Sequence, residues 1–180
     1  VTLHKLAYFA GTGEIVDSSD GRWDRPDTGI AFIGDSICQN AKLFYGDWNT
    51  ILGRSACANY GIGGQTTLEC RARIGELAAR NYRQIVFICG FNDIGHGYTK
   101  EEIVQNYVAM IEAVQASNPD CQFVILSTLP TTSAFYSGQQ GKITLLNLAF
   151  KRFANKTPNV TFVDAYSAFC PKAGEYAYPE

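Results

Sequence analysis

The chain has 180 residues, of which 46% are hydrophobic and 18% charged, and its formal net charge is −2. This length is enough for one domain with a sizeable core. Lysine and arginine form no basic run, which argues against nucleic acid as a partner. No apolar run approaches the roughly 20 residues of a membrane-spanning helix, and the first ten residues lack the pattern of a cleavable signal peptide.

The first 28 residues are predicted to form a leader to the main fold. Residues 11–29 are rich in Gly, Asp and Ser and include Pro26, a composition typical of loops. The main domain is therefore predicted over residues 29–180.

From Gly29 onward, short apolar runs alternate with helical patterns. Because the runs are apolar throughout, they indicate a parallel sheet that is buried on both faces. The predicted fold is α/β, a doubly wound three-layer sandwich with a five-stranded parallel sheet. A capping-box pattern, Thr99 with Glu102, begins the third helix. The predicted strands are 30–33, 56–60, 84–89, 121–126 and 160–163, and the predicted helices are 39–52, 67–80, 100–116 and 140–157.

A serine follows the first predicted strand, in the sequence Gly34-Asp35-Ser36. The active sites of such folds lie at the carboxyl ends of the strands, so this loop is a candidate for chemistry. The amide groups and the dipole at the start of the following helix favour negative charge beside the Ser36 hydroxyl. The alternative interpretation is that Ser36 only caps the helix.

The loops after the second and third strands carry complementary groups. Three glycines, Gly61, Gly63 and Gly64, allow backbone amides to approach a ligand, as an oxyanion hole requires. Their spacing does not fit a dinucleotide-binding motif. In the third loop, the Asn92 side chain is able to donate a hydrogen bond to an oxyanion, although Asn92 and Asp93 are also ordinary turn residues.

Three motifs, taken in chain order, resemble those of the SGNH/GDSL hydrolase family. They are Gly34-Asp35-Ser36, the glycine-rich segment ending at Gly64, and Gly90-Phe91-Asn92-Asp93. The resemblance covers about residues 29–165. It implies a flavodoxin-like fold and no cofactor. It further implies that Ser36 is the nucleophile of an ester hydrolase, and that Ser36 and Gly64 amides and the Asn92 side chain form the oxyanion hole.

The chain departs from the family at the catalytic base. The family places a DxxH motif shortly after the last strand, whereas no histidine follows Val163 here. Three explanations stay open: the sequence is truncated before the catalytic loop and a final helix, the protein is a non-catalytic relative, or another group is the base. The two histidines are His96, which is read as a rim residue more readily than as the base, and the distant His4.

Six cysteines are widely spaced, and no cluster of His and Cys indicates a metal site. Cys89 ends an apolar run and is expected to pack in the core. Cys121 and Cys170 flank the last two predicted strands, so a disulfide between them is one possibility.

The leading hypothesis is an O-acetylesterase that removes small acyl groups from carbohydrate. The expected partners are a small ester or an acylated carbohydrate, and Phe91, Tyr98, Phe135 and Tyr136 are candidates for a sugar-binding rim. The alternatives are a non-catalytic module that binds an acylated glycan, a lysophospholipase or thioesterase, and a flavodoxin-like phosphate-binding protein. The cysteines and the substrate favour a secreted or periplasmic location over the cytoplasm.

Overall fold

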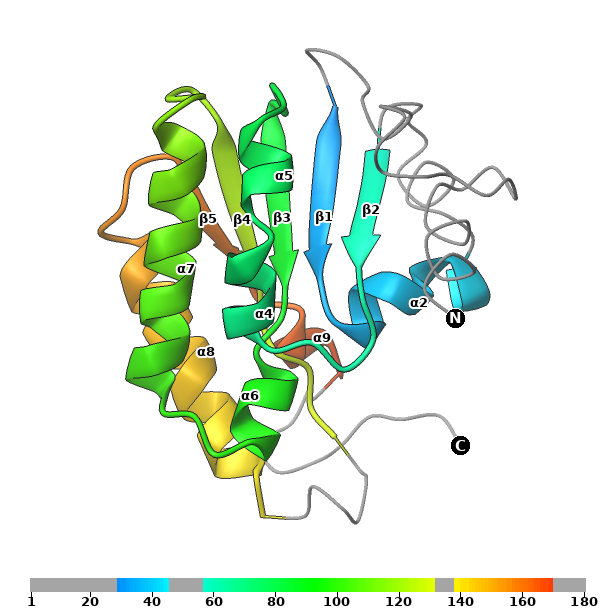
Figure 1. Cartoon of the computed structure of the whole chain (residues 1–180). Coiled ribbons are helices and arrows are strands. Elements are labelled where there is room, and N and C mark those ends of the chain that lie inside the picture. Colours follow the sequence, from blue (N-terminus) through cyan, green and yellow to red (C-terminus); the bar gives the residue numbers. More distant parts are fainter. Residues whose placement is uncertain (1–28, 46–56, 132–137, 170–180) are drawn as a thin grey trace.

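The computed structural model describes residues 29–45, 57–131 and 138–169. They form a five-stranded parallel sheet in the order β2-β1-β3-β4-β5, with helices packed against it (Figure 1). This confirms the predicted α/β class and the parallel sheet. The strands are β1 (Ile30–Gly34), β2 (Cys57–Gly61), β3 (Gln84–Ile88), β4 (Gln122–Leu126) and β5 (Val160–Val163). The described helices are α2 (Ser36–Tyr45), α4 (Thr67–Ala72), α5 (Gly75–Ala78), α6 (Phe91–Gly95), α7 (Lys100–Gln115), α8 (Gln140–Ala154) and α9 (Tyr166–Phe169).

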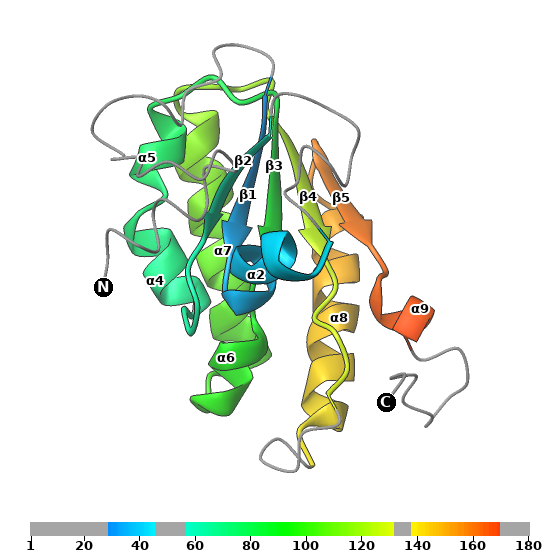
Figure 2. The same cartoon turned by 90° about the vertical axis from the view of Figure 1, so that its right-hand side faces the viewer.

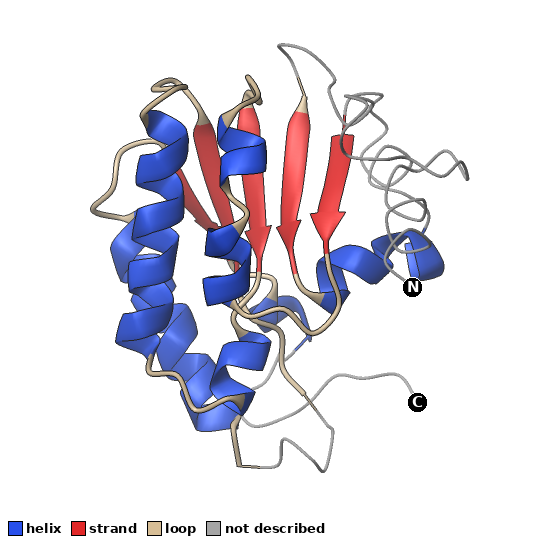
Figure 3. Ribbon diagram, viewed as in Figure 1, coloured by secondary structure: helices blue, strands red, loops and turns tan. Residues whose placement is uncertain are grey.

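One face of the sheet carries the main core. Successive side chains of a strand point to opposite faces, so alternate residues of β1, β3 and β4 meet the helices α4, α5, α7 and α8 on this face. Of these helices, α4, α5 and α7 stand in front of the sheet in Figure 3. Fully buried side chains fill the layer between helices and sheet, and the largest are Tyr82, Tyr107, Phe87, Phe123 and Phe150.

The opposite face is packed mainly around β1. There, Ile30, Phe32 and Ile88 contact Cys38 of α2 in a smaller buried cluster. Figure 2 shows α2 at this side of the sheet, below the ends of β1 and β3. Val163 at the end of β5 is 42% exposed. This part of the sheet is thus less covered by described residues than the part beneath α2.

Three local predictions were wrong, each for a physical reason. The helix predicted over residues 67–80 is two helices, because Arg73 (φ −115°) ends α4 and α5 begins at Gly75. Helices α6 and α9 were missed because one turn is too short to show a helical period. Helix α2 begins at Ser36, three residues earlier than predicted, and the predicted extension beyond Tyr45 lies outside the described residues.

The predicted capping box at α7 is confirmed. The Thr99 hydroxyl accepts the Glu102 N–H at 3.2 Å, and the Glu102 carboxylate accepts the Thr99 N–H at 2.8 Å. A second capping box, Thr66 with Glu69, begins α4 and was not predicted. It ends the glycine-rich segment that follows β2, so it helps to determine where that loop stops.

Among the described residues, no helix has the length and apolar character that a membrane crossing needs.

Candidate active site

Ser36 is the first residue of α2 and is half-buried at the carboxyl end of β1. The preceding turn is fixed by Asp35, whose N–H donates to the Ile88 carbonyl at 3.1 Å. The Asp35 carboxylate accepts the Ile37 N–H at 2.9 Å and so supplies the side-chain cap of the helix. Because Asp35 has the capping role, the Ser36 hydroxyl is not required for it.

The glycine-rich loop, residues 61–66, lies directly against the start of α2. A Cβ atom at Gly61 would lie 2.7 Å from the Cys38 carbonyl carbon, so only glycine fits there. Asn59 holds this approach, since its Nδ2 donates to the Cys38 carbonyl at 3.0 Å and its Oδ1 accepts the Gly61 N–H at 2.8 Å. A Cβ atom at Gly63 would lie 3.8 Å from the Ser36 Cβ, which places the middle of the loop beside the serine.

Gly64 has a backbone conformation that suits glycine, with φ 82°. Its N–H has no hydrogen-bond acceptor among the described residues. An amide in this state is free to bind an oxyanion.

Asn92 is connected to the same loop. Its Nδ2 donates to the carbonyl oxygen of Gln65, the residue after Gly64, at 2.9 Å. Asn92 belongs to α6, which begins after Gly90 with φ 131° at the end of β3. The structure thus brings Ser36, Gly64 and Asn92 from three strand ends to one edge of the sheet, at the lower end of the strands in Figure 1. This arrangement provides a hydroxyl beside at least two candidate oxyanion donors.

Asp93 has a structural function that the sequence did not reveal. It is fully buried, and its two carboxylate oxygens accept the Thr67 N–H, each at 3.0 Å. The Thr67 hydroxyl also donates to it at 2.5 Å and accepts from Asn106 of α7 at 3.0 Å. The interpretation of Asp93 as a turn residue was therefore incomplete, because its side chain joins α6 to α4 and α7.

Two buried carboxyl groups lie close to the serine. The pKa of Asp35 is raised to about 7, mainly by burial and to a lesser extent by the negative charge of Asp93, while the hydrogen bond from the Ile37 N–H opposes this rise. Burial also raises the pKa of Asp93, while the hydrogen bonds from Thr67 lower it. Asp35 therefore changes its charge near neutral pH, directly before the candidate nucleophile.

Asp35→Asn is expected to remove a pH dependence of stability. A carboxyl whose folded pKa lies above its unfolded value stabilises the fold when protonated, and this stabilisation is lost as the pH rises from about 4 to about 7. The free energy of unfolding of the wild type should therefore fall by up to the order of 4 kcal/mol relative to the variant over this range. Denaturant unfolding at pH 4.5 and 8 measures this difference. An equal pH dependence in both proteins would contradict it, and Asp120→Asn, at an exposed carboxylate, is the control.

His96 is exposed at the end of α6. Its ring Nδ1 lies 2.8 Å from the Asn92 carbonyl oxygen, which also accepts the His96 N–H at 2.9 Å. His4 lies outside the described residues. Asp164, after β5, accepts the N–H of Ser167 at 3.0 Å and its hydroxyl at 2.7 Å, so it caps α9. These contacts identify no residue as the base.

A very small cavity lies at the carboxyl ends of β1, β3 and β4, and Ser36 is not among its lining residues. Its volume is about 10 Å³, and its lining includes Asp35 and Ile37 on either side of Ser36 and Phe91 before Asn92. Leu126 and Leu129 from the end of β4 close it. A cavity of this volume holds about one water-sized group, so it has no room for a long acyl chain.

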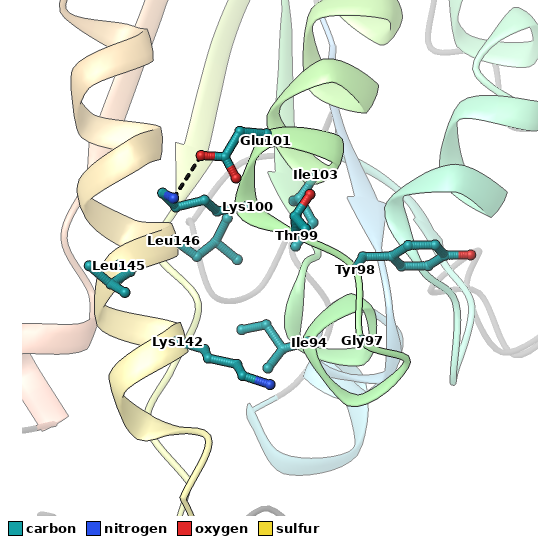
Figure 4. A pocket seen from close by; sticks show the side chains of 10 residues that line it. All are labelled: Ile94, Gly97, Tyr98, Thr99, Lys100, Glu101, Ile103, Lys142, Leu145 and Leu146. Carbon is teal, nitrogen blue, oxygen red and sulfur yellow. Dashed lines mark ion pairs between the residues drawn. The ribbon is translucent and has the colours of Figure 1, made fainter.

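A larger pocket, about 270 Å³, lies between the start of α7 and α8 (Figure 4). Its apolar lining includes Ile94, Ile103 and Leu146, with the Lys142 side chain reaching across. Tyr98 belongs to this pocket, although its ring points away from the other lining side chains. None of the three candidate catalytic residues lines it. Among the predicted rim aromatics, Phe91 borders the small cavity, while Phe135 and Tyr136 lie outside the described residues.

Among the described cysteines, Cys70, Cys89 and Cys121 are free thiols. Cys89 is 6% exposed and belongs to the main core, as predicted. Cys121 is buried, and its suggested partner Cys170 lies outside the described residues. No group of three or more His, Cys, Asp or Glu residues within the described part is arranged to hold a metal ion.

The comparison with known families decides the relationship. The model of the GDSL-like lipase/acylhydrolase family matches residues 32–179. The chain belongs to this family. The match spans the candidate serine, the glycine-rich loop and Asn92, so the resemblance seen in the motifs is confirmed. Membership places the chain among the carboxylic ester hydrolases.

Curated protein sequences resemble the chain at low identity. The platelet-activating factor acetylhydrolase IB subunit alpha2 of Gallus gallus is 28% identical, over 89% of this chain and 68% of that protein. Its human counterpart is also 28% identical, over 81% and 62%. The chain thus spans about two thirds of the length of these relatives.

Solved structures agree on the architecture. A GDSL family protein from Veillonella parvula superposes with a TM-score of 0.66 at 22% identity, covering 82% of this chain and 84% of that one. An acetyl-xylooligosaccharide esterase from Geobacillus superposes with a TM-score of 0.66 at 17% identity, covering 83% and 81%. At these identities the structural matches support the fold alone.

Proposed function

We propose that the chain is a serine esterase that removes acetyl groups from carbohydrate, with Ser36 as the nucleophile. The observation that carries this proposal is the convergence of Ser36, Gly64 and Asn92 at one sheet edge, with the Gly64 N–H lacking an acceptor among the described residues. A nucleophile beside preorganised donors is the arrangement that acyl transfer requires.

The reaction follows from this geometry in two steps. The Ser36 oxygen attacks the ester carbonyl, and the resulting oxyanion is bound by the N–H groups of Ser36 and Gly64 and by the Asn92 side chain. Collapse releases the alcohol and leaves an acyl-enzyme, which water then hydrolyses to free Ser36. No metal or organic cofactor is needed for these steps.

A general base must accept the proton of the Ser36 hydroxyl, and we propose three candidates for this base. His96 binds the Asn92 carbonyl through Nδ1, which leaves Nε2 for proton transfer. His4 is the second candidate base. A histidine encoded after Glu180, in an Asp-x-x-His motif, is the third. Alanine variants of both histidines test the first two, and a chain extended by the encoded residues tests the third.

Two observations support acetyl as the acyl group. The cavity lined by Asp35 and Ile37, the two neighbours of Ser36 in the chain, has a volume of about 10 Å³, which suits a group no larger than a methyl. The names of two similar proteins, an acetylhydrolase and an acetyl-xylooligosaccharide esterase, share the acetyl group but differ in the alcohol. An acetylated carbohydrate is our first proposal for the substrate, and platelet-activating factor, after which the acetylhydrolase is named, is the second.

A panel of p-nitrophenyl esters from acetyl to decanoyl tests the acyl preference. We expect kcat/KM to be highest for acetyl and to fall roughly tenfold by butyryl, because each added methylene lacks space in the cavity. Rates that rise with chain length would contradict the proposal and favour a lysophospholipase or thioesterase. Rates with acetylated xylooligosaccharide and with platelet-activating factor, measured side by side, then decide the alcohol.

Binding without hydrolysis is the outcome that would favour a non-catalytic module for acylated glycans. For the location, we propose export from the cytoplasm on the basis of the carbohydrate substrate. Cys70, Cys89 and Cys121 add no support to this proposal, since they are free thiols.

A further inference from the structure

Arg73, at the end of α4, bridges the two ends of the glycine-rich loop. Its Nη2 donates to the Tyr60 carbonyl at 2.5 Å, just before the loop begins. Its Nε donates to the Gln65 side-chain oxygen at 2.8 Å, directly after Gly64. The guanidinium is half-buried and has no carboxylate partner among the described residues. Its hydrogen-bonding capacity is thus directed to this loop.

Gln65 connects Arg73 to Asn92, which follows β3. While its side chain binds Arg73, its carbonyl oxygen accepts the Asn92 Nδ2–H at 2.9 Å. The thiol of Cys89, at the end of β3, lies 3.6 Å from the same carbonyl. Two of the three candidate oxyanion donors therefore depend on Gln65, because Gly64 directly precedes it in the chain and Asn92 is hydrogen-bonded to it.

The loop has a flexible composition, which other hydrogen bonds, such as that from the Ile62 N–H to the Gly34 carbonyl, also help to order. Three of the four residues 61–64 are glycines. Glycines lose much conformational freedom when the chain is ordered. An arginine is suited to hold such a segment, because its planar guanidinium presents several donors in a fixed geometry to two acceptors. A lysine amine has neither the planarity nor the span.

We propose that Arg73 is a positioning residue for the ester hydrolysis, holding Gly64 and Asn92 in the geometry that binds the oxyanion. This inference rests on the proposed oxyanion hole. Arg73 acts through Gln65, and it is not assigned any contact with the substrate.

The variants are Arg73→Met and Arg73→Lys, with Arg71→Met as the matched control. Arg71 lies on the same helix, but its guanidinium donates to Asn106 of α7 at 3.3 Å and not to the loop. We expect both Arg73 variants to lower kcat for p-nitrophenyl acetate roughly 10- to 100-fold with KM nearly unchanged, since a small displacement of the donors is costly in the transition state. Arg71→Met should have less than a roughly threefold effect.

A double-mutant cycle and hydrogen exchange separate positioning from general destabilisation. In an Asn92→Ala background, the effect of Arg73→Met on kcat should shrink to a few-fold, because the two residues act through one contact. The Ile62 and Gln65 amides, which donate to Gly34 and Ile62, should exchange roughly tenfold faster in Arg73→Met than in Arg71→Met at equal global stability.

Additive effects in the cycle, or unchanged exchange of both amides, would overturn the positioning role. If the wild type shows no hydrolysis that depends on Ser36, the proposed function fails. The exchange measurement then still decides whether Arg73 holds the loop.

Discussion

Ser36→Ala should reduce the hydrolysis of p-nitrophenyl acetate by roughly 10³-fold or more, down to the background rate of the oxyanion donors alone. The physical reason is that the acyl-enzyme cannot form without the hydroxyl, whereas the fold loses little. Asp35, not Ser36, provides the side-chain cap of α2, so the melting temperature should remain close to that of the wild type. Initial rates and thermal unfolding on the same preparations measure both effects.

Ser117→Ala is the matched control for this experiment. Ser117 lies after α7 and donates to the Ala78 carbonyl at 2.6 Å, away from the three strand-end loops. Retained activity in Ser36→Ala would exclude Ser36 as the nucleophile. Activity that is absent from both the variant and the wild type would contradict hydrolysis by this chain and direct attention to glycan binding.

Asn92→Ala should lower kcat by roughly 10²- to 10³-fold while KM changes little, since its side chain is proposed to bind the oxyanion only as charge develops on the carbonyl oxygen. The variant also loses the hydrogen bond to the Gln65 carbonyl. Steady-state kinetics with p-nitrophenyl acetate separate the two parameters.

Asn118→Ala controls for the loss of an asparagine hydrogen bond. Asn118 is also half-buried and donates to a main-chain carbonyl, that of Tyr82, at 2.8 Å. Tyr82 precedes β3, so this contact lies at the opposite end of the strands from Ser36. Equal losses of kcat in the two variants would show that the Asn92 effect is structural, and would remove it from the oxyanion hole.

Strand positions were predictable from the sequence because each strand is a short apolar run that is buried between layers. The run 160–163 coincides with β5, and 84–89 exceeds β3 by one residue. The short helices were not predictable. Helix α6 has five residues, and its Asp93 side chain is hydrogen-bonded to Thr67, 26 positions earlier in the chain.

The three motifs, Ser36 after the first strand, Gly64 after the second and Asn92 after the third, are determined by the sequence alone. Parallel strands bring their carboxyl ends to one edge, so their proximity follows from the order of elements. What only the tertiary structure decided is how these residues are held. The contact of Asn92 with Gln65 and the contacts of Arg73 with both ends of the loop join residues that are distant in the chain. The burial that raises the pKa of Asp35 likewise comes from residues distant in the chain. Such contacts leave no local pattern, because hydrogen bonds and desolvation depend on which atoms meet in space and not on their spacing in sequence.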